Sequence, residues 1–235
     1  MMKHKVKVVI FWHTYLDNDF KLLVQEQMTK LFTSGLYERA DVINTGISSP
    51  SEDNTKWFLE LLSKYPKFHP LVHVDNDAEK ATLRVMDLYC KANVGDDYYV
   101  MYFHTKAVTN TSYNNILWRW SMDYNIIHRW KDCLFALNGA DAVGINLRYD
   151  THLGYHPHFS GTYWWSKANY IRTLQEKYLY DKEYLLDLHP KANILLAEFY
   201  IGSNHQGKLK SMFECGDVAP YNTECLITEY IKPIV

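Results

Sequence analysis

The feature that most constrains the fold is an apolar run, Tyr99 to Phe103, that ends abruptly in the polar residues His104, Thr105 and Lys106. A continuous apolar run of this length indicates a strand buried on both faces of an α/β sheet. Ligands bind such sheets beyond the carboxyl ends of the strands. The three polar residues are therefore candidate ligand-binding residues, and the alternative is that they only begin a solvated loop.

Apolar runs alternate with amphipathic helical patterns through the first half of the chain. Strands are expected at Val6–Trp12, Ala40–Ile43, Leu71–Val74 and Tyr98–Phe103. This alternation predicts βαβ units and a mainly parallel sheet, as in a nucleotide-binding half of Rossmann type. Neither G-x-G-x-x-G nor G-x-x-x-x-G-K-[ST] is present, which argues against the usual dinucleotide-binding and P-loop classes.

The second half predicts fewer regular elements. The longest helix is expected at about Tyr113 to Leu137, because its apolar residues recur with helical spacing and a glycine follows. A strand is expected at Asp141–Asn146 and a last helical region at Ala192–Ile201. No internal repeat or long linker divides the chain. The sequence predicts a single domain over 1–235, with a nucleotide-binding half (about 1–106) and an acceptor half with a C-terminal tail (about 107–235).

Composition excludes some classes and leaves others open. The formal net charge is -2, so no overall basic field points to nucleic acid. The chain has 19 tyrosines and 7 tryptophans, which suit either a cleft that stacks on ring-shaped ligands or an aromatic core. The four cysteines form no C-x-x-C pair, and the N-terminal apolar run is too short for a signal or membrane segment. We expect a cytoplasmic protein with free thiols and no transmembrane segment.

Two segments could hold a metal ion. Asp75 and Asp77 have the D-x-D spacing with which two carboxylates hold a divalent cation against a diphosphate, although they could equally cap or turn the chain before the next helix. His152, His156 and His158 lie close together, but Gly154 and Pro157 prevent one regular helix. They could form a metal site or a loop of histidines that contacts an acceptor.

Three further groups could take part in binding or catalysis, and each has a structural alternative. Gly161, in the segment from Ser160 to Trp165, marks a possible close approach of a ligand, and Trp164 and Trp165 point to opposite faces if the segment is extended, so that one could line a cleft. Glu198 lies in an apolar segment and is either paired for structural reasons or poised as a base. His205 to Lys210, which includes Lys208, is either a second phosphate clamp or a basic turn.

These motifs together resemble glycosyltransferases of the GT-A fold. The resemblance rests on Tyr102 to Lys106, on the tryptophan-containing helix that follows, and on His158-Phe159-Ser160-Gly161-Thr162-Tyr163-Trp164-Trp165. It extends over about 97–205. Within this fold, the motifs resemble those of bacterial and viral polysaccharide glycosyltransferases with an HTK strand end, including those similar to rhamnan synthesis protein F. It implies an α/β fold, with a mixed, mainly parallel central sheet flanked by helices.

The resemblance also implies roles for particular residues. A nucleoside-diphosphate sugar would be the donor and a glycan the acceptor. The donor would contact Trp12, His13, Thr14, Asp75, Asp77, His104, Thr105, Lys106, His205 and Lys208. The acceptor would contact His158, Ser160, Gly161, Trp164 and Trp165, and Glu198 would be the catalytic base of an inverting reaction.

One departure from the family concerns the metal. The acid pair that usually closes the fourth strand is replaced by His104, Thr105 and Lys106. A requirement for Mn²⁺ or Mg²⁺ is left open, with Asp75, Asp77 and His205 as the residues that would hold the ion. A lysine at the strand end could neutralise a leaving diphosphate by direct charge.

The leading interpretation is a transferase that uses UDP or another nucleotide in polysaccharide biosynthesis. The first alternative is a non-catalytic glycan-binding or degenerate transferase-like module. A further alternative is a metal-dependent hydrolase built on the histidine loop.

Overall fold

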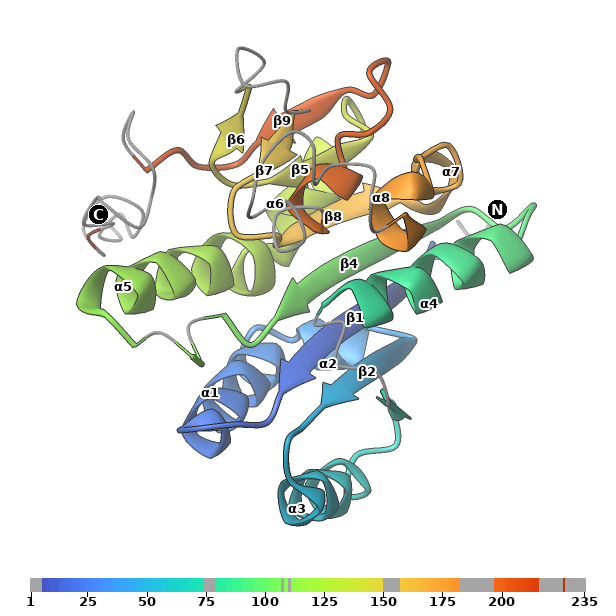
Figure 1. Cartoon of the computed structure of the whole chain (residues 1–235). Coiled ribbons are helices and arrows are strands. Elements are labelled where there is room, and N and C mark those ends of the chain that lie inside the picture. The colour runs from blue at the N-terminus through green and yellow to red at the C-terminus, as the bar shows by residue number, and fades with distance from the viewer. Residues whose placement is uncertain are drawn as a thin grey trace.

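A seven-stranded mixed sheet organises the protein (Figure 1). The computed structural model describes residues 6–73, 79–106, 108–109, 111–149, 157–181, 197–215 and 226. The sheet has the strand order β3-β2-β1-β4-β8-β5-β9, and β8 runs antiparallel to its neighbours β4 and β5. Its strands are β1 (Lys7–Tyr15), β2 (Val42–Ser48), β3 (Phe68–Val72), β4 (Tyr98–His104), β5 (Ala142–Gly144), β8 (Trp164–Lys167) and β9 (Leu209–Ser211).

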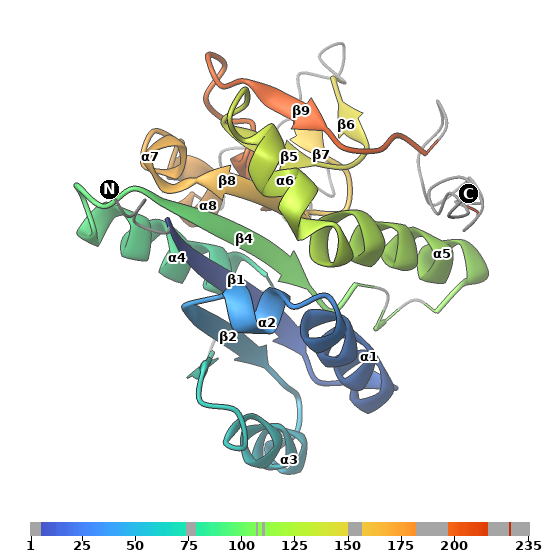
Figure 2. The same ribbon diagram turned by 180° about the vertical axis from the view of Figure 1, so that it is seen from behind.

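Helices cover both faces of this sheet (Figures 1 and 2). A separate two-stranded ribbon pairs β6 (Leu147–Arg148) with β7 (His158–Phe159). The helices are α1 (Phe20–Thr33), α2 (Leu36–Arg39), α3 (Glu52–Leu62), α4 (Lys80–Ala92), α5 (Tyr113–Met122), the π-helix η1 (Asp123–His128), α6 (Trp130–Ala136), α7 (Ala168–Ile171) and α8 (Lys177–Tyr180).

Strand β4 separates two apolar cores because successive side chains of a strand point to opposite faces. Met101 and Phe103 belong to the core beneath α1 and α5, whereas Val100 and Tyr102 belong to the core beneath α4, α7 and α8. Strands buried on both faces need apolar side chains at every position, which explains the uninterrupted run. The chain turns polar at His104, where the strand ends.

The two ends of the strands define two edges of the sheet. Strands β1, β2, β3 and β4 are parallel, and β5 and β9 run in the same direction because β8 is antiparallel to both β4 and β5. We call the edge where these strands end the carboxyl edge, and the edge where they begin the amino edge. His104 and Lys106 lie at the carboxyl edge.

The α/β fold class and the mixed, mainly parallel sheet are confirmed, and several boundaries differ. Strand β3 begins at Phe68 and includes Pro70, which an edge strand tolerates because proline lacks only the donor that points away from the sheet. The long helix is divided by η1, where the backbone N–H of Arg129 donates to the carbonyl of Tyr124, five residues earlier. Strand β9 was not predicted.

The cysteines differ from the expectation in one respect. Cys90 and Cys133 are free and buried, but Cys215 is disulfide-bonded, so the prediction of free thiols is wrong for Cys215. In the part of the chain that the structure describes, no helix is long and apolar enough to cross a membrane.

Candidate active site

Lys106 presents a positive charge at the carboxyl edge. Its ammonium group lies 4.4 Å from the centre of the Trp118 ring, on α5, which is a favourable cation–π distance. The ammonium group makes no hydrogen bond or ion pair with any other residue that the structure describes. The ring therefore holds the ammonium in place and leaves its three N–H donors available to an anionic ligand.

Thr105 has a structural role beside it. Its backbone N–H donates to the carbonyl of His13 at 3.0 Å, and its hydroxyl accepts from the backbone N–H of Tyr15 at 2.9 Å. The side chain is buried. Thr105 thus ties the ends of β1 and β4 together and fixes the position from which Lys106 leaves the sheet.

His104 is neutral and already has a partner. Its Nε2 lies 3.0 Å from the carbonyl oxygen of Gly161, so this nitrogen carries the proton and donates it. Burial, followed by the nearby charge of Lys106, lowers the pKa of His104 to about 3. A neutral imidazole adds no positive charge for a phosphate, so the charge at this strand end comes from Lys106.

Gly161 connects the strand end to Glu198. Its carbonyl accepts from His104, and its N–H donates to Oε1 of Glu198 at 3.1 Å. Gly161 has a φ of 96°, and a Cβ there would lie 2.5 Å from Sδ of Met122. Only glycine takes this conformation without strain and lets its backbone pack so closely.

Glu79 is a second carboxyl group in the same cluster, and the sequence did not single it out. The hydroxyl of Tyr102 donates to Oε2 of Glu79 at 3.3 Å, and Nε2 of His104 lies 3.8 Å from the same oxygen. Burial, together with the negative charge of Glu198, raises the pKa of Glu79 to about 7, against the opposing effect of Lys106. Glu79 could have been noticed as an acid just before a helix that follows a strand end.

The predicted donor residues of the first strand are buried rather than exposed to a cleft. The Trp12 side chain is in the core, stacked on Phe103 at 5.5 Å, and its indole N–H donates to Gln27. Thr14 is also buried and donates to the carbonyl of Gly46. Neither side chain is placed to contact a base, so we leave both out of the proposed site.

His13 lies in a buried histidine pair behind the site. Its Nδ1 is 2.9 Å from the hydroxyl of Thr82, and Nε2 of His73 lies at the same distance from that hydroxyl. Burial, then the proximity of His104 and His73, lowers the pKa of His13 well below its usual value. His13 is almost inaccessible and His73 is half-buried, so His13 is not exposed to a ligand at the site.

The predicted acceptor residues divide into buried and accessible ones. Trp164 and Trp165 do point to opposite faces, but both are fully buried, one in each core, because helices cover both faces of β8. His158 is buried with its ring 4.8 Å from that of Phe199. Ser160 is half-buried, and its N–H donates to Asn146.

His205 and Lys208 lie at the amino edge, away from His104 and Lys106. Lys208 precedes β9, whose first residue pairs with Ala142 at the start of β5, and the backbone N–H of Lys208 donates to Asp141. The turn that carries His205 packs beside α7, where Nδ2 of Asn204 donates to Thr173 (Figure 1). The strand register therefore excludes a phosphate clamp made from these residues and Lys106.

Only some of the candidate metal ligands are among the described residues. Asp75, Asp77, His152 and His156 lie outside the described residues. His205 is at the amino edge and so does not fit a metal site at the end of β4. Among the residues that the structure does describe, no group of three or more His, Cys, Asp or Glu side chains could hold a metal ion.

The fold is of the Rossmann-like type found in nucleotidyltransferases and GT-A glycosyltransferases. The chain belongs to the family described as Domain of unknown function (DUF8361), whose model matches residues 10–209. No curated protein matches the sequence. The finer resemblance to enzymes similar to rhamnan synthesis protein F therefore stays a prediction.

Solved structures share the architecture at low sequence identity. One is 4-diphosphocytidyl-2C-methyl-D-erythritol synthase from Anaerococcus prevotii, with 12% identity, a TM-score of 0.50 and coverage of 96% of this chain and 95% of the synthase. HddC from Yersinia pseudotuberculosis has 10% identity, a TM-score of 0.44 and coverage of 89% and 91%. TarS (residues 1–349) from S. aureus has 11% identity, a TM-score of 0.42 and coverage of 91% and 59%. At 12% identity the comparison with the synthase supports the fold alone.

Proposed function

We propose that the protein is a glycosyltransferase that moves a sugar from a nucleoside-diphosphate sugar to a hydroxyl group of a glycan, with inversion at the anomeric carbon. One observation carries the proposal. At the carboxyl edge, the carboxylate of Glu198 accepts from the Gly161 backbone, and the charges of Glu198 and of Lys106, whose ammonium has no ion-pair partner among the described residues, both act on the buried carboxyl group of Glu79. A cation for a leaving group and a carboxylate for a proton are the two groups that such a displacement needs.

Glu198 is the base in this mechanism. One of its oxygens is held by the Gly161 N–H, and the other makes no hydrogen bond to a described residue. The acceptor hydroxyl gives its proton to that carboxylate as its oxygen attacks the anomeric carbon. The new bond joins the acceptor oxygen to this carbon, and the bond from the carbon to the diphosphate oxygen breaks on the opposite side.

Lys106 stabilises the leaving diphosphate. Negative charge grows on the diphosphate oxygens as the glycosidic bond breaks, and an ammonium already held by Trp118 meets that charge without reorganising. His104 contributes by fixing Gly161, which in turn orients Glu198. His104 is therefore a positioning residue.

The negative charge of Glu198 acts on the buried carboxyl group of Glu79. Two interacting carboxyl groups favour a state in which one is ionised and the other protonated. The raised pKa of Glu79 makes it the protonated member near neutral pH.

The proposal routes no step through a metal ion. Mn²⁺ or Mg²⁺, held by Asp75 and Asp77 against the diphosphate, would add positive charge to that of Lys106. The name of the synthase that shares this fold describes a product that contains a diphosphocytidyl group, which is consistent with a fold that binds a nucleoside diphosphate.

The proposal is tested with a panel of UDP-, GDP- and dTDP-sugars, each with and without Mn²⁺. We expect a rise in melting temperature with one nucleotide class, since a ligand that binds the folded state stabilises it. We also expect release of the corresponding nucleoside diphosphate from its sugar. Binding with no release by any sugar nucleotide, even with mixed glycan acceptors, would favour the non-catalytic glycan-binding module. No binding at all would contradict the proposal.

A further inference from the structure

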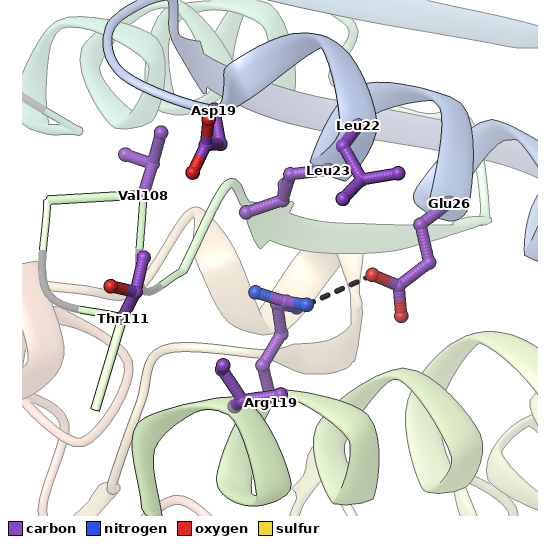
Figure 3. Close-up of a pocket in the computed structure, with 8 residues that line it drawn as sticks. Asp19, Leu22, Leu23, Glu26, Val108, Thr111 and Arg119 are labelled. Carbon is purple, nitrogen blue, oxygen red and sulfur yellow. Dashed lines mark hydrogen bonds and ion pairs between the residues drawn. The ribbon is translucent and has the colours of Figure 1, made fainter. Parts of the chain in front are cut away.

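A pocket lies between α1 and α5, next to the loop that follows β4 (Figure 3). Its volume is about 170 Å³. Pockets for drug-sized ligands have volumes of roughly 300–1,000 Å³, so this one fits a single ring and is too small for a nucleotide. The lining residues are Asp19, Leu22, Leu23, Glu26, Val108, Thr111, Ile116 and Arg119.

The guanidinium of Arg119 has N–H donors in this pocket that make no hydrogen bond to the described residues. The residue is 7% exposed, and its guanidinium points from α5 toward α1 (Figure 3). One nitrogen donates to Oε2 of Glu26 at 2.9 Å, which is its only hydrogen bond to the described residues, and the buried Nε has no partner. A buried guanidinium with unused N–H donors is costly, and a ligand oxygen in the pocket would reduce that cost.

The charges of the lining argue for a neutral ligand. Asp19 and Glu26 supply two carboxylates in the lining, and Arg119, together with Lys30 paired with Glu26, supplies two positive charges, so the charges balance. Although burial opposes it, the hydrogen bond and charge of Lys30, together with Arg119, lower the pKa of Glu26, so this carboxyl group is ionised at neutral pH. An anion would be repelled by the carboxylates, and a cation by the guanidinium.

The remaining lining suits a sugar ring. Leu23, Val108 and Ile116 give aliphatic walls, and Thr111 adds a hydroxyl group to the lining. A pyranose presents C–H groups to such walls and hydroxyls that donate to carboxylates and accept from a guanidinium. Leu22, 70% exposed, forms the rim, where a bound ring would cover it.

We propose that this pocket binds one neutral sugar ring of the glycan acceptor, beyond the ring that reacts. This inference rests on the proposed function and adds to it the class of acceptor. In the lining, Val108 is two residues from Lys106, and Arg119 is next to Trp118, on which the Lys106 ammonium packs, so the pocket borders the site. Binding energy gained at a ring remote from the reaction helps to hold the reacting hydroxyl in place.

The test uses methyl glycosides of glucose, galactose, mannose, rhamnose and N-acetylglucosamine, with methyl glucuronide as the anionic counterpart. Binding to the full chain is followed by saturation-transfer NMR. Leu22→Trp fills the rim with a larger side chain and, because Leu22 is exposed, leaves the core intact. Leu88→Trp is the matched control, at a leucine 59% exposed on α4, on the other face of the sheet.

We expect at least one neutral glycoside to bind the wild type and Leu88→Trp, with about a tenfold or greater loss of affinity in Leu22→Trp. Arg119→Lys should weaken binding as well, since lysine keeps the charge and loses the planar fork. Equal binding to Leu22→Trp, or binding of no neutral glycoside, would overturn the inference. Tighter binding of the glucuronide than of every neutral glycoside would contradict the inference that the ligand is neutral.

These outcomes separate the pocket from the proposed function. Glycoside binding that depends on Leu22, in a protein that binds no sugar nucleotide, would uphold the pocket and contradict the transferase. Sugar-nucleotide binding that depends on Lys106, with release of the nucleoside diphosphate and with no glycoside bound, would uphold the transferase and contradict the pocket.

Discussion

The two edges of the sheet carry similar residues in different surroundings. His104 and Lys106 lie at the carboxyl edge, and His205 and Lys208 lie at the amino edge. At the carboxyl edge the lysine packs on Trp118, and Glu79, Glu198 and the backbone of Gly161 meet beside it. At the amino edge His205 and Lys208 are exposed on the turn that precedes β9.

The difference lies in burial and in the number of chain segments that meet. Burial shifts the pKa of a histidine and of a carboxyl group at the carboxyl edge, which is typical of a site with chemistry to perform. Residues on an exposed turn keep their water, so their charges act weakly on one another. A histidine near a lysine in the sequence therefore does not by itself predict a binding site; the prediction also depends on the edge of the sheet at which the two residues lie.

The largest effect is expected from Glu198→Gln. Loss of a general base costs about 10²–10⁴-fold in rate, while nucleotide binding should persist because Lys106 is unchanged. Turnover of the best sugar nucleotide is measured for Glu198→Gln and for the control variant Glu60→Gln, which replaces an exposed glutamate on α3. Full activity of Glu198→Gln would remove Glu198 from the mechanism.

Glu79→Gln should change how stability depends on pH. The pKa of Glu79 rises from 4.5 to about 7 on folding, so the folded protein holds this proton more tightly. The resulting stability is fully present below pH 4.5 and is lost as the pH rises toward 7, by up to about 3 kcal/mol. Glutamine cannot titrate, so thermal melts of Glu79→Gln should lack this decline. Identical pH profiles for variant and wild type would contradict the buried-carboxyl interpretation.

Gly161→Ala should destabilise the carboxyl edge. A non-glycine residue at this positive φ, with its Cβ 2.5 Å from Met122, costs about 1–3 kcal/mol. Gly139→Ala is the control, since nothing lies within 4 Å of the Cβ it would add. Thermal unfolding should show a lower melting temperature for Gly161→Ala alone.

The smallest effect is expected when Lys106 and Lys208 are each replaced by alanine. Lys106→Ala should weaken nucleoside-diphosphate affinity by about tenfold, as expected for one charge-assisted hydrogen bond. Lys208→Ala should leave the affinity unchanged because Lys208 is at the amino edge. Calorimetric titration with UDP, or whichever nucleotide binds, measures both. Equal losses in the two variants would remove the distinction between the edges.

The sequence predicted the sheet and the position of its polar end, because buried strands and amphipathic helices leave strong periodic patterns. It did not predict η1 or β9, since a π-turn and a three-residue edge strand leave almost no pattern. The tryptophans were open to two interpretations. Trp12, Trp164 and Trp165 proved to be core residues, because both faces of the sheet are covered.

The sequence alone determined that His104, Thr105 and Lys106 stand at the end of a buried strand, since a strand buried on both faces must be apolar and its end need not be. Tertiary structure decided the rest. It left the charge to Lys106 by burying His104 as a neutral donor, brought Glu79 and Glu198 together from distant segments, and placed His205 at the other edge. Contacts between segments far apart in the chain depend on strand order and register, which no local pattern encodes.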